Sequence, residues 1–312
     1  MAAIVMLTLF ALGLGLIVQG GDWFVDSASR IAEASGVPRF IIGATIVSLG
    51  TTLPELLVSL LATRRGLAGI AVGNAVGSVT ANVGLIMGLS LLCQPGKIDR
   101  RTQGPGLGLM VLAIGLLLAA SRNGQLSAIG CGALIALLAA HLALSVSGAR
   151  ATRGQRGPVR RLGRQTIRFL AGAAGVTVGA RLLVENGAAL ALMLGVSEGV
   201  VGATLVAVGT SLPELVTALG ALARRQASLS IGNVVGANII DLTLILPLCR
   251  LLSPRELAIP PQSLRLDMPF CLALSLLAAV PPLLSGRFRR WQGAALLAAY
   301  AAYVALLYRA AI

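Results

Sequence analysis

Residues 43–62 read GATIVSLGTTLPELLVSLLA, an apolar run interrupted at its centre by the segment from Gly50 to Glu55. A run of this length can span a bilayer as a helix. Pro54, however, has no N–H to donate, and its ring clashes with the carbonyl four residues earlier. We therefore expect the helix to break there, in mid-membrane. Backbone carbonyls freed by such a break are tolerated only where they line a cavity or bind an ion.

The composition around this stretch is that of a membrane protein. Of the 312 residues, 56% are hydrophobic and 12% charged, with a mean hydropathy of +0.89, whereas soluble domains carry about 25% charged residues. The predicted fold is an all-α polytopic membrane protein with ten spans. No basic residue precedes the first span, so we expect a retained helix rather than a cleaved signal. The spans are roughly 2–20, 38–62, 69–93, 104–121, 126–147, 167–184, 200–222, 228–249, 268–285 and 292–309.

The stretch occurs twice in the chain. It aligns without gaps on residues 202–221, GATLVAVGTSLPELVTALGA, at an offset of 159 residues and with 12 of 20 positions identical. The same offset aligns residues 70–86 on residues 229–245, with 6 of 17 identical. Each half holds five predicted spans, so the second half enters the membrane from the opposite side. The sequence thus predicts two inverted repeats with broken helices, an arrangement suited to alternating access at the repeat interface.

Basic residues divide and orient the chain. Seven Arg lie between residues 150 and 168, which predicts a basic cytoplasmic linker at 149–166 between the halves 1–148 and 167–312. If the N-terminus is outside, 17 of the 25 Lys and Arg residues face the cytoplasm, so we expect both termini outside an inner (plasma) membrane. The net charge of +14 then reflects contact with anionic lipid. We expect no nucleic-acid partner and no obligate protein partner.

Three of the eleven acidic residues lie deep in predicted spans: Glu55, Glu214 and Asp241. An ionised carboxylate there costs at least a few kcal/mol, which makes it a functional candidate. Apart from Arg39, at the very start of the span that holds Glu55, no Lys or Arg lies within these three spans to pair with them. Glu55 and Glu214 also occupy equivalent repeat positions. We expect Glu55 and Ser78 to meet near the midplane, because each is about ten residues, or ~15 Å of helix, from the connecting turn.

Neutral oxygens accompany these acids at helical spacing. Thr51 and Thr52 precede Glu55 by four and three residues and share its face; Asn82 lies one turn after Ser78. Oxygen ligands suit hard cations such as Ca²⁺, whereas zinc, copper or iron would call for His or Cys. Two ionised Glu side chains would repel each other until a divalent cation, Na⁺ or protons relieved the repulsion. The predicted ion ligands are Glu55, Glu214, Thr51, Thr210, Ser78, Asn82, Asp241, Thr52 and Ser211, with the carbonyls of Ser48 and Ala207.

At these motifs, GTTLPE…GNAVGSVTAN and GTSLPE…GNVVGANIID, the chain resembles the cation/Ca²⁺ exchanger superfamily, in its prokaryotic Na⁺/Ca²⁺ exchanger branch. The resemblance implies an antiporter, not an enzyme, with Ca²⁺ and Na⁺ as substrates and no cofactor. It implies that Glu55 and Glu214 are shared central ligands and that Thr51 and Thr210 complete a Ca²⁺ site. The remaining ligands serve Na⁺ or middle sites: Ser78, Asn82 and Asp241, with the carbonyls of Ser48 and Ala207.

Two positions depart from the family pattern, which usually has Gly-Ser-Asn after the Gly-Asn pair. The first repeat has Val79 after Ser78, and the second has Ala237 before Asn238. Ala237 removes a hydroxyl that the family places on a Na⁺ site, so the counter-ion stays open. Ca²⁺/H⁺ exchange and K⁺-dependent exchange are alternatives. A channel would not need inverted halves, and an intramembrane aspartyl protease would use two Asp sharing a proton.

Overall fold

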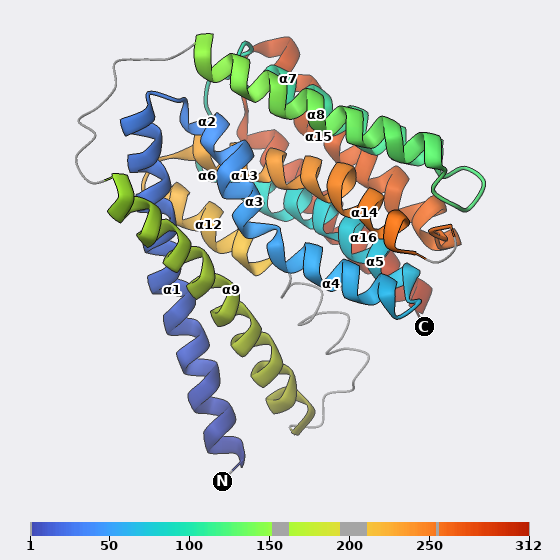
Figure 1. The fold of residues 1–312 in the computed structure, drawn as a ribbon, viewed down its shortest axis with the longest axis horizontal. Coiled ribbons are helices and arrows are strands. Elements are labelled where there is room, and N and C mark those ends of the chain that lie inside the picture. Colours follow the sequence, from blue (N-terminus) through green and yellow to red (C-terminus); the bar gives the residue numbers. More distant parts are fainter. Residues whose placement is uncertain (1, 152–161, 194–210, 254–255, 312) are drawn as a thin grey trace.

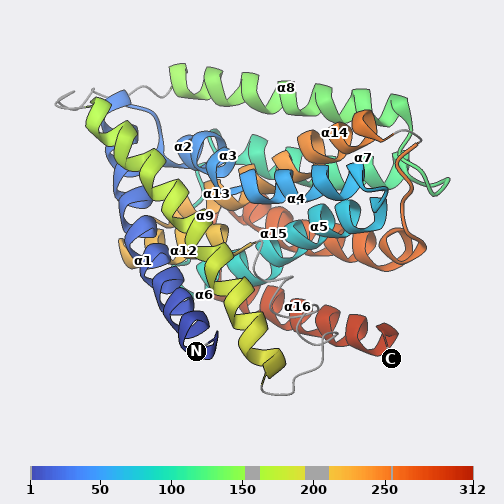
Figure 2. The same cartoon turned by 60° about the horizontal axis from the view of Figure 1, so that its bottom comes forward.

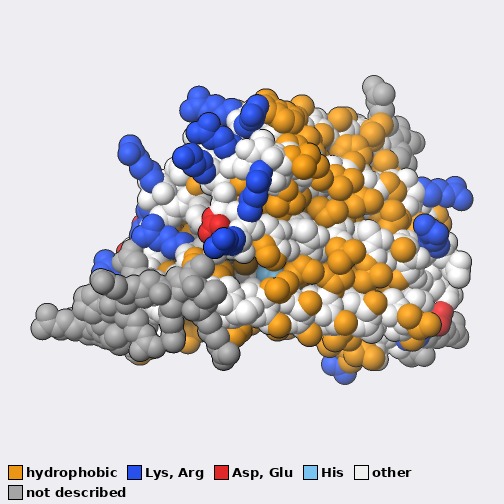
Figure 3. All heavy atoms as spheres, turned by 90° about the horizontal axis from the view of Figure 1, so that it is seen from above, with side chains coloured by type: hydrophobic (Ala, Val, Ile, Leu, Met, Phe, Trp, Pro, Cys, Tyr) orange, Lys and Arg blue, Asp and Glu red, His pale blue; other side chains and the backbone are white. Residues whose placement is uncertain are grey.

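The computed structural model describes residues 2–151, 162–193, 211–253 and 256–311, and the regular structure in these ranges is helical (Figure 1). Within them, six helices are long and apolar enough to cross a membrane, or seven if one bent pair counts as a span. Figure 3 shows apolar side chains over much of one face, with Lys and Arg gathered mainly toward one end. The all-helical membrane fold is therefore confirmed, while the count of ten spans stays a prediction.

Two central helical units form the core. The first runs through α5 (Ala68–Ala81), η2 (Asn82–Met87) and α6 (Gly88–Cys93), and the second through α13 (Ala227–Ile240), η4 (Asp241–Ile245) and α14 (Leu246–Leu252). In an apolar 18-residue stretch of each unit, 67% and 78% of the residues are buried. In the other long apolar helices this share is 39% or less. The η segments are π-helical turns, which form frequently at functional sites.

A broken helix packs against this core. It consists of α2 (Arg39–Ile42), η1 (Gly43–Val47), α3 (Ser48–Thr51) and α4 (Leu53–Arg64), with a bend of 45° between the part up to Thr51 and α4. Pro54 lies in the first turn of α4, where a missing N–H is tolerated. The predicted break beside Pro54 is thus confirmed. Its counterpart α12 (Leu212–Ala223) likewise begins with a Pro in its first turn.

Close glycine contacts set the approach of the broken helix to α13. A Cβ built on Gly232 would lie 2.3 Å from the carbonyl oxygen of Phe40, and one on Gly236 would lie 2.4 Å from that of Ala44. Neither distance is compatible with a side chain, so both positions require glycine. The small residues in the second Gly-Asn motif therefore serve close helix packing.

Several further helices lie around this core. They are α7 (Gly104–Ala120), α8 (Ala128–Ala151), η5 (Ser263–Asp267), α15 (Met268–Ser285) and α16 (Arg290–Ala311). Two backbone clasps join their connecting segments. In one, Ile98 N donates to Gly286 O and Phe288 N to Gly96 O; in the other, Leu126 N donates to Leu257 O and Ile259 N to Gly124 O. These clasps tie the surrounding helices to each other at both ends of the bundle.

The helices α1 (Ala2–Ser35) and α9 (Leu162–Met193) run side by side at one edge of the molecule (Figures 1 and 2). They approach closely at glycines: a Cβ on Gly13 would lie 2.8 Å from Gly179 O, and one on Gly20 would lie 2.9 Å from Gly172 O. Phe24 stacks on Phe169 with ring centroids 4.4 Å apart. The two helices thus form a tightly packed pair.

The first helix is longer than its hydropathy predicted. The prediction ended it near residue 20, but α1 continues to Ser35 because nothing between these points breaks a helix. It stops at Gly36, whose φ of +67° suits glycine, two residues before Pro38. Asp22 and Asp26 therefore lie within a helix. Arg224, just after α12, forms ion pairs with them at 2.6 Å and 3.4 Å.

Candidate ion-binding site

Three buried carboxylates come from both halves of the chain. Glu55 lies in the first turn of α4, Glu214 lies in the first turn of α12 and Asp241 is the first residue of η4; each is 1% exposed or less. All six of their carboxylate oxygens are buried without a hydrogen-bond partner among the described residues. Buried polar groups are otherwise nearly always paired. These oxygens are therefore available as ligands for a cation.

The three acids also lie close enough to interact electrostatically. Glu55 interacts with both Glu214 and Asp241, and Asp241 interacts with Glu214. Like charges in a dry environment destabilise one another strongly. Within the described ranges, however, no three Asp, Glu, His or Cys side chains are grouped so that they could hold one metal ion. Any cation bound here would therefore also need neutral oxygens.

The neutral oxygens of the predicted site are also buried, and two of them meet across the halves. Ser211, which precedes α12, donates from Oγ to Ser78 Oγ of α5 at 3.3 Å, so hydroxyls from the two halves meet. Asn82 lies at the first position of η2, as Asp241 does in η4. Its Oδ1 is buried and has no partner in the described structure. The predicted ligands Ser78, Ser211 and Asn82 are thus brought together with the opposite half.

The threonines at the helix break have a different arrangement from the one expected. Thr52 donates to the Ser48 carbonyl from its backbone N at 2.9 Å and from Oγ1 at 2.6 Å, and Thr51 Oγ1 lies 3.3 Å from the same carbonyl. The expectation that the break leaves the Ser48 carbonyl free is therefore wrong. A hydroxyl that donates still has lone pairs for a cation, so Thr51 and Thr52 remain candidate ligands.

Two further predicted ligands, Thr210 and Ala207, lie outside the described residues. The predicted meeting of Glu55 and Ser78 also stays a prediction, since no contact between them is described. Asn74 of α5 does contact α4 beside Glu55: its Nδ2 donates to Glu55 O at 3.2 Å and to Ser59 Oγ at 3.0 Å. The antiparallel pairing of α4 with α5 is thus as expected.

Two asparagines were missed as site residues. Asn233 accepts from Thr51 Oγ1 at 3.3 Å, and Asn238 accepts from Asn82 Nδ2 at 3.0 Å. Both are fully buried in α13. In the sequence, Asn233 is part of the Gly-Asn motif of the second repeat, and Asn238 differs from Val79, its equivalent in the repeat alignment. That mismatch was the available signal.

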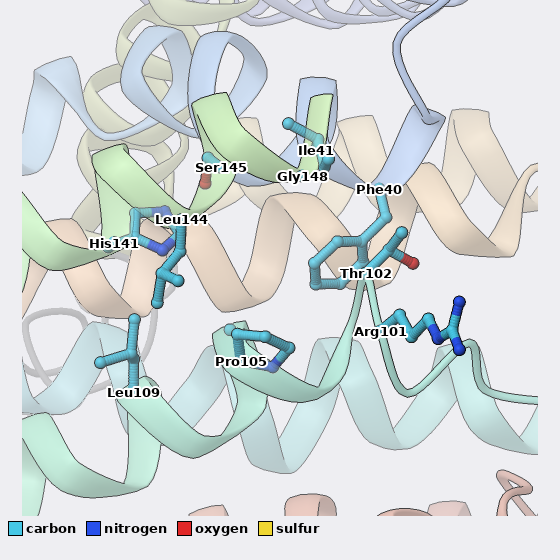
Figure 4. A pocket seen from close by; sticks show the side chains of 11 residues that line it. Phe40, Ile41, Arg101, Thr102, Pro105, Leu109, His141, Leu144, Ser145 and Gly148 are labelled. Carbon is cyan, nitrogen blue, oxygen red and sulfur yellow. The ribbon is translucent and has the colours of Figure 1, made fainter. Parts of the chain in front are cut away.

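A small pocket lies apart from the acids, between α2, α7 and α8 (Figure 4). His141 of α8 lines it, with Arg101 near its other end. A His141 ring nitrogen lies 2.9 Å from the carbonyl oxygen of Ala44 in η1. None of the predicted ion ligands lines this pocket.

Known proteins are similar to this chain over nearly its whole length. The sequence model of the family described as sodium/calcium exchanger protein matches residues 5–147 and 165–309. The sodium/calcium exchanger MaX1 of Methanosarcina acetivorans is 31% identical over 340 residues, covering 95% of this chain and 97% of that protein. The inner membrane protein YrbG of Escherichia coli is 35% identical over 284 residues, covering 87% of each.

A solved structure of the sodium-calcium exchanger NCX_Mj has the same fold. Its TM-score to this chain is 0.87 at 34% sequence identity, and the match covers 97% of this chain and 99% of that one. The family match extends over both halves, including the two motifs that carry the buried acids. The family consists of ion transporters without a cofactor, so the expectation that the chain is not an enzyme is confirmed. From its sequence, its fold and its paired acidic motifs, this chain belongs to the sodium/calcium exchanger family.

Proposed function

We propose that the chain is a secondary antiporter that exchanges Ca²⁺ for Na⁺ at the buried acids described above. The observation that carries the proposal is that six carboxylate oxygens from both halves are buried with no hydrogen-bond partner in the described part of the chain. With the neighbouring hydroxyls and the Asn82 amide, they form an all-oxygen donor set of the kind that Ca²⁺ and Na⁺ take. Glu55 and Glu214 are assigned as shared central ligands, with Asp241, Ser78 and Asn82 beside them.

Exchange follows from the charge of the site. Three ionised carboxylates without a cation repel one another, so the empty site is disfavoured. Ca²⁺ or several Na⁺ ions relieve the repulsion, and both draw on the same carboxylates. Binding of one ion therefore opposes binding of the other, which couples their movements. Thr51 and Thr210 are assigned to the Ca²⁺ site together with the two glutamates.

Alternating access is supported by a crosswise glycine pairing. The repeat offset of 159 residues relates Gly13 to Gly172 and Gly20 to Gly179, yet Gly13 meets Gly179 and Gly20 meets Gly172. Two equivalent helices that cross in this way are related by a local two-fold axis. We infer ten spans in two inverted halves, 1–148 and 167–312, which would open the site to each side in turn.

The orientation is proposed from charge. With both termini outside, the basic linker at 149–166 faces the cytoplasm and the anionic headgroups of an inner membrane. The lipid bilayer is the one partner that this assignment requires. The family match, which omits residues 148–164, supports a linker at this place.

Transport into proteoliposomes tests the proposal. Purified protein is reconstituted, and ⁴⁵Ca²⁺ uptake is measured with an outward gradient of Na⁺, K⁺ or H⁺ imposed one at a time. The expected result is uptake that responds to the Na⁺ gradient. Uptake driven by the pH gradient alone would replace Na⁺ with protons as counter-ion, and a steady ionic current without coupling would indicate a channel.

A further inference from the structure

Three buried side chains form a hydrogen-bonded series that ends at the candidate site. Met110 in α7 is followed by Asn238 in α13 and then by Asn82 in η2, and all three are 1% exposed or less. Asn238 Nδ2 donates to Met110 Sδ at 3.3 Å, and Asn82 Nδ2 donates to Asn238 Oδ1 at 3.0 Å. The chain ends at Asn82 Oδ1, which is buried without a partner among the described residues.

Met110 sets the order of donors and acceptors in this hydrogen-bonded series. A thioether sulfur accepts hydrogen bonds but has none to donate. The Asn238 amide nitrogen therefore faces Met110, and its oxygen faces Asn82. This orientation in turn requires the Asn82 nitrogen to face Asn238, so the Asn82 oxygen points away from Asn238 and is left for another partner.

Orientation matters at Asn82 because an amide has two chemically different ends. An oxygen directed at a cation is a ligand, whereas an NH₂ group in the same place repels the cation. The repeat offset places Asp241 at the position equivalent to Asn82. A carboxylate presents an oxygen in either orientation and needs no such device.

The two repeats differ at the position of the orienting amide, as this argument predicts. The position equivalent to Asn238 is Val79, which is fully buried and carries no polar group. Asn82 of the first half thus has the orienting amide of Asn238 in the opposite half. For Asp241 of the second half, the equivalent residue in the opposite half is the apolar Val79. This difference gives a physical reason for one of the two departures from the family pattern.

We propose that Asn238, held by Met110, is a positioning residue that fixes the Asn82 amide with its oxygen toward the bound Na⁺. The inference rests on the proposed function, in which Asn82 belongs to the Na⁺ or middle sites. Asn238 and Met110 would then set the affinity for Na⁺ without touching the ion. The Ca²⁺ site, assigned to Glu55, Glu214 and the two threonines, should be little affected.

Two substitutions separate positioning from packing. Asn238→Leu removes both amide ends at similar size, and Met110→Leu removes only the acceptor sulfur. Met87→Leu is the matched control, because Met87 is also fully buried, lies in η2 with Asn82, and has no described hydrogen bond. Two constants are measured in proteoliposomes: the half-saturating Na⁺ concentration for Na⁺-driven ⁴⁵Ca²⁺ uptake, and the half-saturating Ca²⁺ concentration for Ca²⁺/Ca²⁺ exchange without Na⁺.

We expect Asn238→Leu to raise the half-saturating Na⁺ concentration by about three- to tenfold, as for one lost hydrogen bond. Met110→Leu should raise it by roughly two- to fourfold, because a thioether is a weak acceptor. The Ca²⁺ constant should stay unchanged in both, and both constants should stay unchanged in Met87→Leu. If Asn238→Leu does not fold, Met110→Leu tests the same hydrogen-bonded series with a milder change.

A double variant gives the sharper readout. If Asn238 acts only through Asn82, adding Asn238→Leu to Asn82→Ala should change nothing further. An additional loss in that background, an equal rise in the Ca²⁺ constant, or an unchanged Na⁺ constant in both Asn238→Leu and Met110→Leu would overturn the inference. A different pattern marks failure of the proposed function itself: uptake by the native protein that ignores Na⁺, or an Asn82→Ala variant that exchanges normally.

Discussion

At the scale of single residues, the unpaired carboxylates dominate the chemistry. Glu55, Glu214 and Asp241 are buried, repel one another, and have no hydrogen-bond partner for their carboxylate oxygens among the residues that the structure describes. Each of these features is unfavourable in an isolated folded chain. Together they are explained if a cation supplies the missing interactions during transport.

Removing one central charge while keeping its shape tests this view. We expect Glu55→Gln and Glu214→Gln each to lower Na⁺-driven Ca²⁺ uptake by at least ~100-fold, since a charged ligand contributes about 3 kcal/mol. Glu256→Gln is the control, because Glu256 is exposed and pairs with Arg250 at 3.6 Å. Size-exclusion profiles should be normal for all three variants. Near-native uptake by either site variant would rule out its assignment.

A hydroxyl added at Ala237 should strengthen Na⁺ binding. Ala237 is fully buried, is equivalent to Ser78 in the repeat, and lies one turn before Asp241. A new neutral or charge-assisted ligand contributes about 1–2 kcal/mol. Ala237→Ser should therefore lower the Na⁺ concentration for half-maximal exchange by roughly five- to thirtyfold.

The native protein should accordingly show weak Na⁺ dependence. Ala71→Ser is the control for Ala237→Ser, because Ala71 is equally buried but lies in the apolar cluster of α5. The Ca²⁺ constant should not change in either variant. A Ser variant with native Na⁺ dependence would show that position 237 does not contact the ion.

At the scale of helices, glycine contacts hold the broken helix against α13. We expect Gly232→Ala to lower the free energy of unfolding by about 1–3 kcal/mol, because its Cβ would overlap the Phe40 carbonyl. Gly132→Ala in α8 meets no atom within 4 Å and should leave the stability unchanged or slightly raised. Thermal unfolding in detergent measures both. Equal stability of the two variants would contradict the packing argument.

At the scale of the whole molecule, the charge distribution predicts the topology. A Cys introduced between residues 152 and 164 should react in intact cells only with membrane-permeant thiol reagents, and one appended after Ile312 should react with impermeant ones. Cys93 is the exposed native cysteine, whereas Cys131, Cys249 and Cys271 are buried, so a Cys93→Ser background suits the experiment. The reverse labelling would place both termini inside.

Much of this protein was predictable from local chemistry. The helix break follows from Pro54, the acids deep in the spans from their apolar neighbours, and the relation between the halves from the fixed repeat offset. These features depend on sequence distances of a few residues or on self-similarity, both of which are visible in one chain. The length of α1 was missed because hydropathy falls at Asp22 while helix formation does not.

The tertiary structure decided which polar groups pair with each other. Only packing shows that the Thr51 hydroxyl lies 3.3 Å from Asn233 Oδ1, 182 residues away in the sequence. Likewise, Asn82 and Asn238 are 156 residues apart in sequence, and their hydrogen bond exists because η2 and α13 cross in the core. The sequence determines which oxygens are available for a cation. Their orientation depends on contacts between distant segments, which form only when the halves pack together.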